Sequence, residues 1–144
     1  MVANKDLWEK CRDGKVEEVR EALARGADPN STSTNRHDTL LMTAASYKQE
    51  ELVDLLLAQP GIEVNKRSTY NNITALHIAC LDGSNGCLMK LLAVPGIDVN
   101  ALDKENGTPM MWAVNCSNTE AVRLMAAVAN LVCKFPDGQS LEER

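Results

Sequence analysis

The residues with the clearest capacity for chemistry are His77 and Cys80, three positions apart in the segment Thr74-Ala-Leu-His-Ile-Ala-Cys80. On a helix this spacing places the imidazole and the thiol on one face, where they could serve as paired zinc ligands. The alternative is that Cys80 fills a core position that requires a small side chain. We prefer this structural interpretation and expect no metal site.

Residues suited to catalysis are scarce elsewhere. The only other histidine, His37, has no nucleophile close to it in the sequence. The GxSxG, P-loop, HExxH and GxGxxG motifs are absent. Trp8 and Trp112 fall on core-facing helix positions, so we expect them to pack rather than to stack on a ligand. The sequence therefore predicts a protein that is not an enzyme and has no catalytic residue and no cofactor.

The composition is that of a folded, acidic protein. Hydrophobic residues make up 44% of the chain, so disorder is not expected away from its ends. The net charge of −5 argues against nucleic acid or an anionic membrane as a partner, because both require a concentrated positive field. No apolar stretch reaches the length of a membrane span, and the N-terminus lacks the apolar region of a secretion signal. The cysteines then indicate reduced thiols in an intracellular protein of the cytoplasm, with the nucleus as an alternative.

Two signatures recur along the chain. The first begins with threonine, as Thr39-Leu-Leu-Met-Thr-Ala-Ala45, Thr74-Ala-Leu-His-Ile-Ala-Cys80 and Thr108-Pro-Met-Met-Trp-Ala-Val114, and its starts are 35 and 34 residues apart. The second is Gly26-Ala-Asp-Pro-Asn30, Gly61-Ile-Glu-Val-Asn65 and Gly96-Ile-Asp-Val-Asn100, with both spacings 35. Fixed periods of this length indicate a repeat architecture.

The two signatures resemble the ankyrin repeat, whose pattern is a TPLHxAA helix start, a Gly-His turn, an LLL second helix and a GADVN exit. The resemblance covers nearly the whole chain. It implies an all-α solenoid of stacked helix-turn-helix units with β-turn fingers, and a structural role for His77. It divides a single domain, 1–144, into repeats at about 5–30, 31–65, 66–100 and 101–134, followed by a stub at 135–144 that is either a truncated or a capping repeat.

Each repeat also carries signals for its helix starts. The expected N-caps are Thr39, Thr74 and Thr108. His77 stands where a capping box would be closed, whereas Met42 and Met111 replace it and should lose that polar bridge. Gly14 and Gly83 follow the first helix of their repeats, where a left-handed residue is needed. Lys48 and Ser117 occupy this place in the other repeats, at an expected strain of about 1 kcal/mol each.

The resemblance implies that a partner protein contacts the finger tips and the concave face formed by the first helices. The fingers correspond to 31–38, 66–73 and 101–107. The residues expected to contact the partner are Ser46, Tyr47, Lys66, Arg67, Tyr70, Leu81, Asp82, Lys104, Glu105 and Asn115. Tyrosine is common at binding hot spots, but Tyr47 could instead pack on the adjacent repeat and Tyr70 could be an ordinary surface residue. Lys66 and Arg67 lack an acidic neighbour in their finger. They could bind an acidic patch on a partner, or the finger could be only a solvated loop.

Asn65 and Asn100 stand in contexts similar to ankyrin asparagines that an oxygen-sensing asparaginyl hydroxylase modifies. A structural role at the bend is the alternative, because asparagine tolerates unusual backbone angles and bonds locally. Intact mass after incubation with such an enzyme tests the hypothesis, and a mass without an added oxygen ends it.

Three functions are compatible with these features. The first is a non-catalytic interaction module that binds a partner protein and is a monomer rather than a dimer. The second is the ankyrin part of a larger multidomain protein whose activity lies elsewhere. The third is a structural stack that associates with itself.

Overall fold

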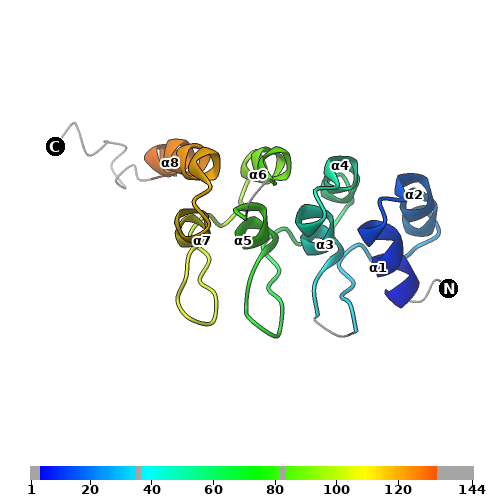
Figure 1. Ribbon diagram of the computed structural model, residues 1–144. Coiled ribbons are helices and arrows are strands. Elements are labelled where there is room, and N and C mark those ends of the chain that lie inside the picture. Colours follow the sequence, from blue (N-terminus) through cyan, green and yellow to red (C-terminus); the bar gives the residue numbers. More distant parts are fainter. Residues whose placement is uncertain (1–3, 35–36, 82–83, 133–144) are drawn as a thin grey trace.

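The computed structural model describes residues 4–34, 37–81 and 84–132, which form a row of helix pairs (Figure 1). The helices are α1 (Asn4–Arg12), α2 (Val16–Ala24), α3 (Leu40–Ser46), α4 (Glu50–Leu57), α5 (Ala75–Ala79), α6 (Asn85–Leu92), α7 (Pro109–Asn115) and α8 (Thr119–Val132). Apart from one antiparallel bridge between Thr32 and Thr39, the described ranges contain no strand pairing. The predicted all-α architecture is confirmed. The predicted stub at 135–144 lies outside the described residues.

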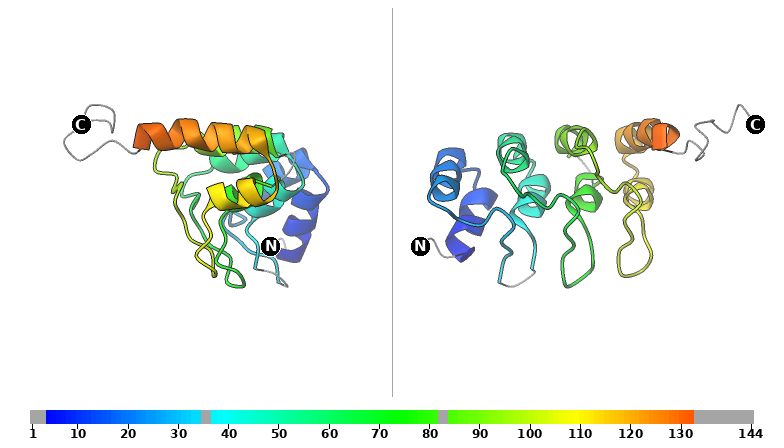
Figure 2. Two further views of the ribbon diagram at one scale, coloured as in Figure 1. Left: turned by 60° about the vertical axis from the view of Figure 1, so that its left-hand side comes forward. Right: turned by 180° about the vertical axis from the view of Figure 1, so that it is seen from behind.

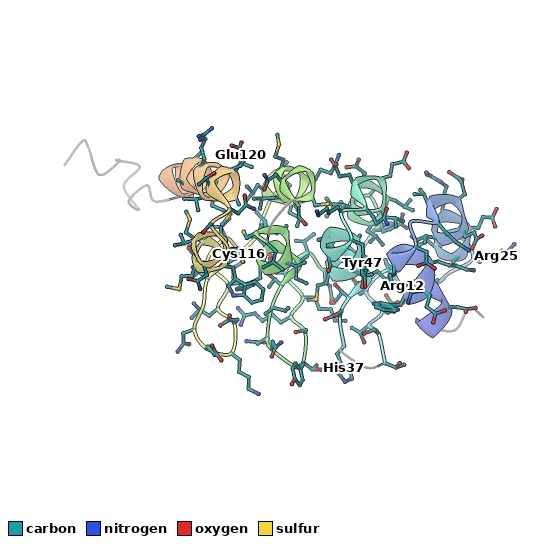
Figure 3. The ribbon with its side chains drawn as sticks, in the orientation of Figure 1. Arg12, Arg25, His37, Tyr47, Cys116 and Glu120 are labelled. Carbon is teal, nitrogen blue, oxygen red and sulfur yellow. The ribbon has the colours of Figure 1, made fainter. Side chains whose placement is uncertain are left out.

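The helix pairs stack into two layers. The inner layer consists of α1, α3, α5 and α7, and the outer layer of α2, α4, α6 and α8, with each helix in contact with the next one in its layer. The loops between pairs extend from the inner layer as fingers (Figure 2). His37 lies at the tip of the first finger, whereas Glu120 lies on the outer layer (Figure 3). None of the helices described combines the length and the apolarity needed to cross a membrane.

Threonine caps begin α3, α5 and α7, as predicted. The hydroxyls of Thr39, Thr74 and Thr108 accept the backbone N–H three residues later at 3.1, 3.4 and 3.2 Å. The His77 imidazole closes the capping box, since its Nδ1 accepts the Thr74 N–H at 3.1 Å. The expected loss of this bridge at Met42 was wrong, because the buried Met42 sulfur accepts the Thr39 N–H at 3.5 Å. Met111 is 52% exposed and makes no such contact.

The residues that end the first helices adopt the predicted left-handed backbone. Their φ angles are 73° at Gly14, 57° at Lys48 and 55° at Ser117. Glycine takes this conformation without a Cβ clash, whereas Lys48 and Ser117 each carry a strain of about 1 kcal/mol. Gly83, expected to play the same role, lies outside the described residues.

Burial follows the helix periodicity. The outer helices bury a stripe that consists of Leu52, Val53, Leu55 and Leu56 on α4 and of Cys87, Leu88 and Leu91 on α6. The inner helices pack through small side chains that are fully buried, namely Ala44, Ala45, Ala79, Cys80 and Ala113. Short side chains allow adjacent inner helices to approach closely, so a continuous core runs along the stack.

Two asparagines of the glycine-led signature connect neighbouring repeats. The Asn30 amide donates to the Gly61 carbonyl at 2.9 Å, and its Oδ1 accepts the Glu63 N–H at 2.8 Å. Asn65 makes the same two bonds with the residues 31 and 33 positions later, at 2.9 and 2.8 Å. The sequence predicted only a local role at the bend. The structure shows a clamp that holds one finger base against the next repeat.

Polar side chains at the start of the outer helices form a second set of connections. The bonds run from Gln49 to the Arg12 carbonyl at 3.3 Å, from Ser84 to the Ala45 carbonyl at 3.0 Å and from Asn118 to the Leu81 carbonyl at 3.0 Å. These carbonyls lie at or just past the ends of inner helices, where few N–H groups of the helix are available to them. The Ala45 carbonyl also accepts the Lys48 N–H at 3.2 Å. In each case a side chain of one repeat donates a hydrogen bond to a carbonyl at or just past the end of the inner helix in the repeat before it.

Candidate functional site

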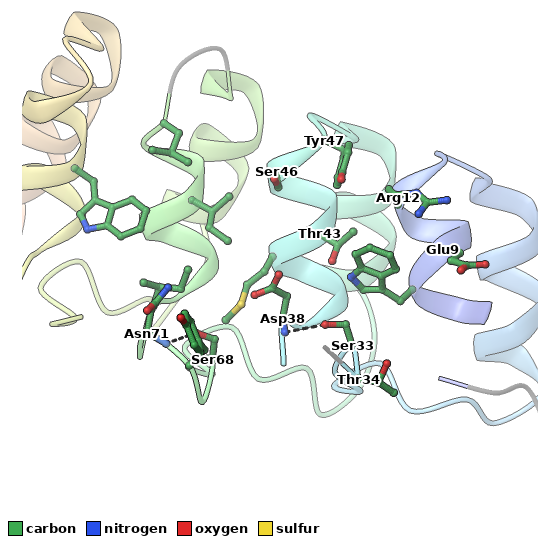
Figure 4. A pocket seen from close by; sticks show the side chains of 17 residues that line it. Glu9, Arg12, Ser33, Thr34, Asp38, Thr43, Ser46, Tyr47, Ser68 and Asn71 are labelled. Carbon is green, nitrogen blue, oxygen red and sulfur yellow. Dashed lines mark hydrogen bonds between the residues drawn. The ribbon is translucent and has the colours of Figure 1, made fainter. Parts of the chain in front are cut away.

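An open cavity of about 840 Å³ runs between the inner helices and the fingers, and we call it the inner groove (Figure 4). It is lined by Trp8, Glu9 and Arg12 of α1, by Ser33, Thr34 and Asp38 of the first finger, by Met42, Thr43, Ser46 and Tyr47 of α3 and its C-cap, by Ser68, Tyr70, Asn71 and Ile73 of the second finger, by Ile78 and Leu81 around α5, and by Trp112 of α7. The inner groove thus draws on four consecutive helix pairs.

Aromatic side chains are concentrated in the inner groove. Both tryptophans and both tyrosines of the chain line it. Tyr47 is 50% exposed and Tyr70 is 70% exposed, so neither ring is buried against an adjacent repeat. Large aromatic side chains left open to solvent in a cavity are typical of binding surfaces.

Arg12 and Trp8 form one end of the inner groove. The Arg12 Cζ lies 5.4 Å from the Trp8 ring centroid, and its Nε and Nη2 donate to the Asp13 carboxylate at 2.9 and 3.4 Å. The hydrogen bond to Asp13 raises the pKa of Arg12, and the Glu9 charge acts in the same direction. The Trp8 indole N–H is buried without a hydrogen-bond partner in the described part of the chain. Such unsatisfied donors are rare in proteins, but this N–H is fully buried and offers no surface to a ligand.

Trp112 forms the opposite end, and its indole N–H is satisfied. It donates to the Asp103 carboxylate at 2.8 Å. Asp103 also accepts the backbone N–H of Gly107, and these two bonds lower the pKa of its carboxyl group. The third finger is thereby fixed to α7, and the Trp112 ring is held in place at the groove wall.

His77 supports this wall and is not available to a metal. Its Nδ1 accepts the Thr74 N–H, and its Nε2 therefore carries the proton that is donated to the Gly107 carbonyl at 2.9 Å. Burial lowers the pKa of His77, and burial raises the pKa of Cys80 to about 12, so both groups are neutral at pH 7. Within the described ranges, no group of three or more His, Cys, Asp and Glu side chains is placed to hold a metal ion.

The structure brings together four of the predicted contact residues. Ser46, Tyr47, Tyr70 and Leu81 all line the inner groove. The arrangement joins the C-terminal ends of α3 and α5 to the second finger, so one partner segment can touch all four residues.

The other predicted contact residues lie outside the inner groove. Lys66 donates to the Asn30 carbonyl at 3.0 Å, and Arg67 donates to the Leu102 carbonyl at 3.3 Å, so both cations bridge fingers. Lys104 and Glu105 are exposed on the third finger, and Asn115 is exposed at the end of α7. Asp82 lies outside the described residues.

Trp8 and Trp112 were not predicted as groove residues. Both are partly buried and pack against the core, as expected, but each also lines the inner groove. Trp8, Thr43, Ile78 and Trp112 are spaced by 35, 35 and 34 residues, so they occupy one position in four repeats. Extending the period through the first repeat, which lacks the threonine-led signature, would have aligned Trp8 with Trp112.

The two asparagines proposed for hydroxylation differ in their surroundings. Both polar atoms of the Asn65 side chain are used in the clamp described above. The Asn100 side chain has no hydrogen-bond partner among the described residues, although its backbone N–H donates to Asp98 at 3.0 Å. The structure thus gives Asn65 a structural role, and hydroxylation of either residue stays a prediction.

Comparison with protein families gives two matches. A model of ankyrin repeats in three copies matches residues 62–135, and a model of a single ankyrin repeat matches residues 36–66. Together they cover three of the helix pairs and the fingers between them.

Similar sequences occur in much longer proteins. The zinc finger CCCH domain-containing protein 24 of Oryza sativa subsp. japonica is 36% identical over 57% of this chain and 12% of its own length. The E3 ubiquitin-protein ligase KEG of Arabidopsis thaliana is 39% identical over 49% of this chain and 4% of its own length. The ankyrin repeat and KH domain-containing protein mask-1 of Caenorhabditis elegans is 42% identical over 46% of this chain and 2% of its own length. The similarity therefore concerns a small part of each relative.

Proposed function

The chain belongs to the ankyrin-repeat family, and we propose that it is a non-catalytic interaction module that binds a partner protein in the inner groove and against the fingers. Ankyrin repeats are in general modules of protein–protein interaction. The observation that carries the proposal is the concentration of both tryptophans and both tyrosines in one open groove. A partner would bury these rings, and burial of large aromatic side chains dominates interface energetics.

The inner groove is also held in shape before a partner arrives. Its walls are inner helices packed through small buried side chains, and its fingers are tied by the Asn30 and Asn65 clamps. A surface that is already ordered loses little conformational entropy on binding, so more of the contact energy appears as affinity.

The proposed contact surface has a centre and a periphery. Ser46, Tyr47, Tyr70 and Leu81 form the centre, within the inner groove. The peripheral contacts are Lys66, Arg67, Asp82, Lys104, Glu105 and Asn115. We place this module inside the cell, as a monomer without cofactor or metal, and with neither nucleic acid nor membrane as its partner.

Capture of partner proteins from a cell lysate tests the proposed surface. The triple variant Tyr47→Ala, Tyr70→Ala, Leu81→Ala is expected to retain about a tenth or less of the partner captured by the parent chain, because it removes central contacts. Met89→Ala is the matched control, since Met89 is an apolar side chain that is 59% exposed on α6 of the outer layer. Equal capture by the triple variant and the control would move the site away from the inner groove.

A second proposal concerns the protein in which these repeats act. Three relatives devote between 2% and 12% of their length to the similar segment, and two of them have names that denote other domains. This supports a role as the ankyrin part of a larger protein in which any catalysis lies elsewhere. The full coding sequence tests it, and a reading frame that encodes ankyrin repeats alone rejects it.

A further inference from the structure

We propose that the inner groove binds an extended peptide segment with basic side chains, arginine or lysine, alternating with apolar ones. The inference rests on the proposed function and specifies the chemistry of the partner. Three features support it: the length of the inner groove, the charges on its walls, and its aromatic and apolar side chains.

The length of the inner groove suits an extended chain. Its lining begins at Trp8 on α1 and ends at Trp112 on α7, so it crosses the whole inner layer. Packed helices lie ~10 Å apart, and the three steps from α1 to α7 therefore cover roughly 30 Å. An extended chain rises ~3.3 Å per residue, so about nine residues fill this length. Exposed Thr34, Ser46 and Asn71 along the way offer hydrogen bonds to a peptide backbone.

The charges that line the inner groove favour a basic occupant. The lining residues that carry a charge at pH 7 are Glu9, Arg12 and Asp38. The Arg12 charge is already balanced by the Asp13 carboxylate at 2.9 Å. Glu9 acts on Arg12 through its charge, but it forms no salt bridge with any residue that the structure describes, so its carboxylate can accept a basic side chain of the partner. The finger cations Lys66 and Arg67 do not line the groove, and they donate instead to backbone carbonyls.

The aromatic side chains add to this preference. Guanidinium and ammonium groups are attracted to aromatic ring faces, and Arg12 over Trp8 already shows this contact at 5.4 Å within the inner groove. The exposed rings of Tyr47 and Tyr70 offer further positions of the same kind. Ile78 and Leu81 supply apolar contacts between them, which suits a peptide whose basic and apolar side chains alternate.

Fluorescence anisotropy with labelled synthetic peptides tests the inference. One probe is a nine-residue peptide that alternates arginine with leucine, and the other has glutamate in place of each arginine. At low salt the basic peptide is expected to bind at least tenfold more tightly, and the difference should shrink at high salt because ions screen exposed charges. Since both tryptophans line the inner groove, saturation with the basic peptide should also shift the intrinsic tryptophan emission.

Two glutamate variants locate the charge effect. Glu9→Gln is expected to weaken binding of the basic peptide about threefold, the scale of one exposed ion pair. Glu51→Gln makes the same change on an exposed residue of α4 in the outer layer and should leave binding unchanged. The inference is rejected if neither peptide binds, if the acidic peptide binds as tightly as the basic one, or if both variants weaken binding equally.

The lysate experiment distinguishes a failure of this inference from a failure of the proposed function. If the triple variant loses its natural partner but the basic peptide neither binds nor competes, the charge inference alone fails. If the triple variant captures the partner as well as the parent chain does, the proposed function fails. Tight binding of the basic peptide to the triple variant would also overturn the placement of the peptide in the inner groove.

Discussion

Replacement of His77 by alanine is expected to lower the free energy of unfolding by about 3–4 kcal/mol. The substitution leaves the buried Thr74 N–H without its partner, at about 1–3 kcal/mol. It also removes one of two donors from the Gly107 carbonyl, which keeps the Asp103 N–H at 2.9 Å, at about 1 kcal/mol. It also removes the ring that packs edge-on against Trp112 at 5.3 Å. Urea unfolding followed by circular dichroism measures the loss. His77→Gln should lose less, because its side chain can still accept the Thr74 N–H.

The same substitution should change the pH dependence of stability. Burial lowers the pKa of His77 in the folded state below the unfolded value of about 6.5. The unfolded state therefore binds more protons, and the His77 contribution is complete above about pH 6.5 and declines as pH falls toward the folded-state pKa. His77→Ala should remove this decline, whereas His37→Ala, at an exposed finger tip, should retain it. A decline of equal size in both variants would assign it to other groups.

Replacement of Asn65 by alanine is expected to lower the free energy of unfolding by about 2 kcal/mol. The variant loses both clamp bonds, at 2.9 and 2.8 Å, and each bond contributes about 1 kcal/mol. Because a solenoid is stabilised by interfaces between neighbouring repeats, the loss falls on the boundary between the second and third repeats. Hydrogen exchange should show the two sides of this boundary opening at different free energies.

Asn100→Ala is the matched control for the clamp. Asn100 occupies the same place in the last glycine-led signature, but its side chain has no hydrogen-bond partner in the described part of the chain. Its replacement should therefore change the free energy of unfolding by about 0.5 kcal/mol or less, as for ordinary surface positions. Equal losses from Asn65→Ala and Asn100→Ala would show that the asparagines act through the backbone bend and not through the clamp.

The fold could be predicted from the sequence because its signals are local. A few adjacent positions in the sequence are enough to identify a threonine that caps a helix, a small residue that faces a neighbouring helix, or a residue that must adopt positive φ. Lys48 and Ser117 were identified in this way, and their φ angles of 57° and 55° confirm it. The Met42 cap was predicted wrongly because the pattern treats sulfur as nonpolar, although a buried sulfur can accept a weak hydrogen bond.

The inner groove could be predicted only in part. Tyr47 and Leu81 were found because they follow the threonine-led signature at a fixed distance. Trp8 was not, because the first repeat lacks that signature and its helix could be identified only by apolar spacing. The partners of Lys66 and Asn65 were also out of reach, since each bond joins residues 31 to 36 positions apart, and the spacing of residue types does not specify which side chain meets which carbonyl.

In the bonds from Gln49, Ser84 and Asn118, the acceptor carbonyl precedes the donor side chain in the sequence. This order matters when the chain is synthesised. A ribosome delivers the chain N-terminus first, so each repeat emerges after the one on which it packs. When each outer helix appears, the carbonyl that its first side chain caps already belongs to a finished inner helix. During synthesis we therefore expect each new repeat to pack onto the repeat made before it, starting from the α1–α2 hairpin.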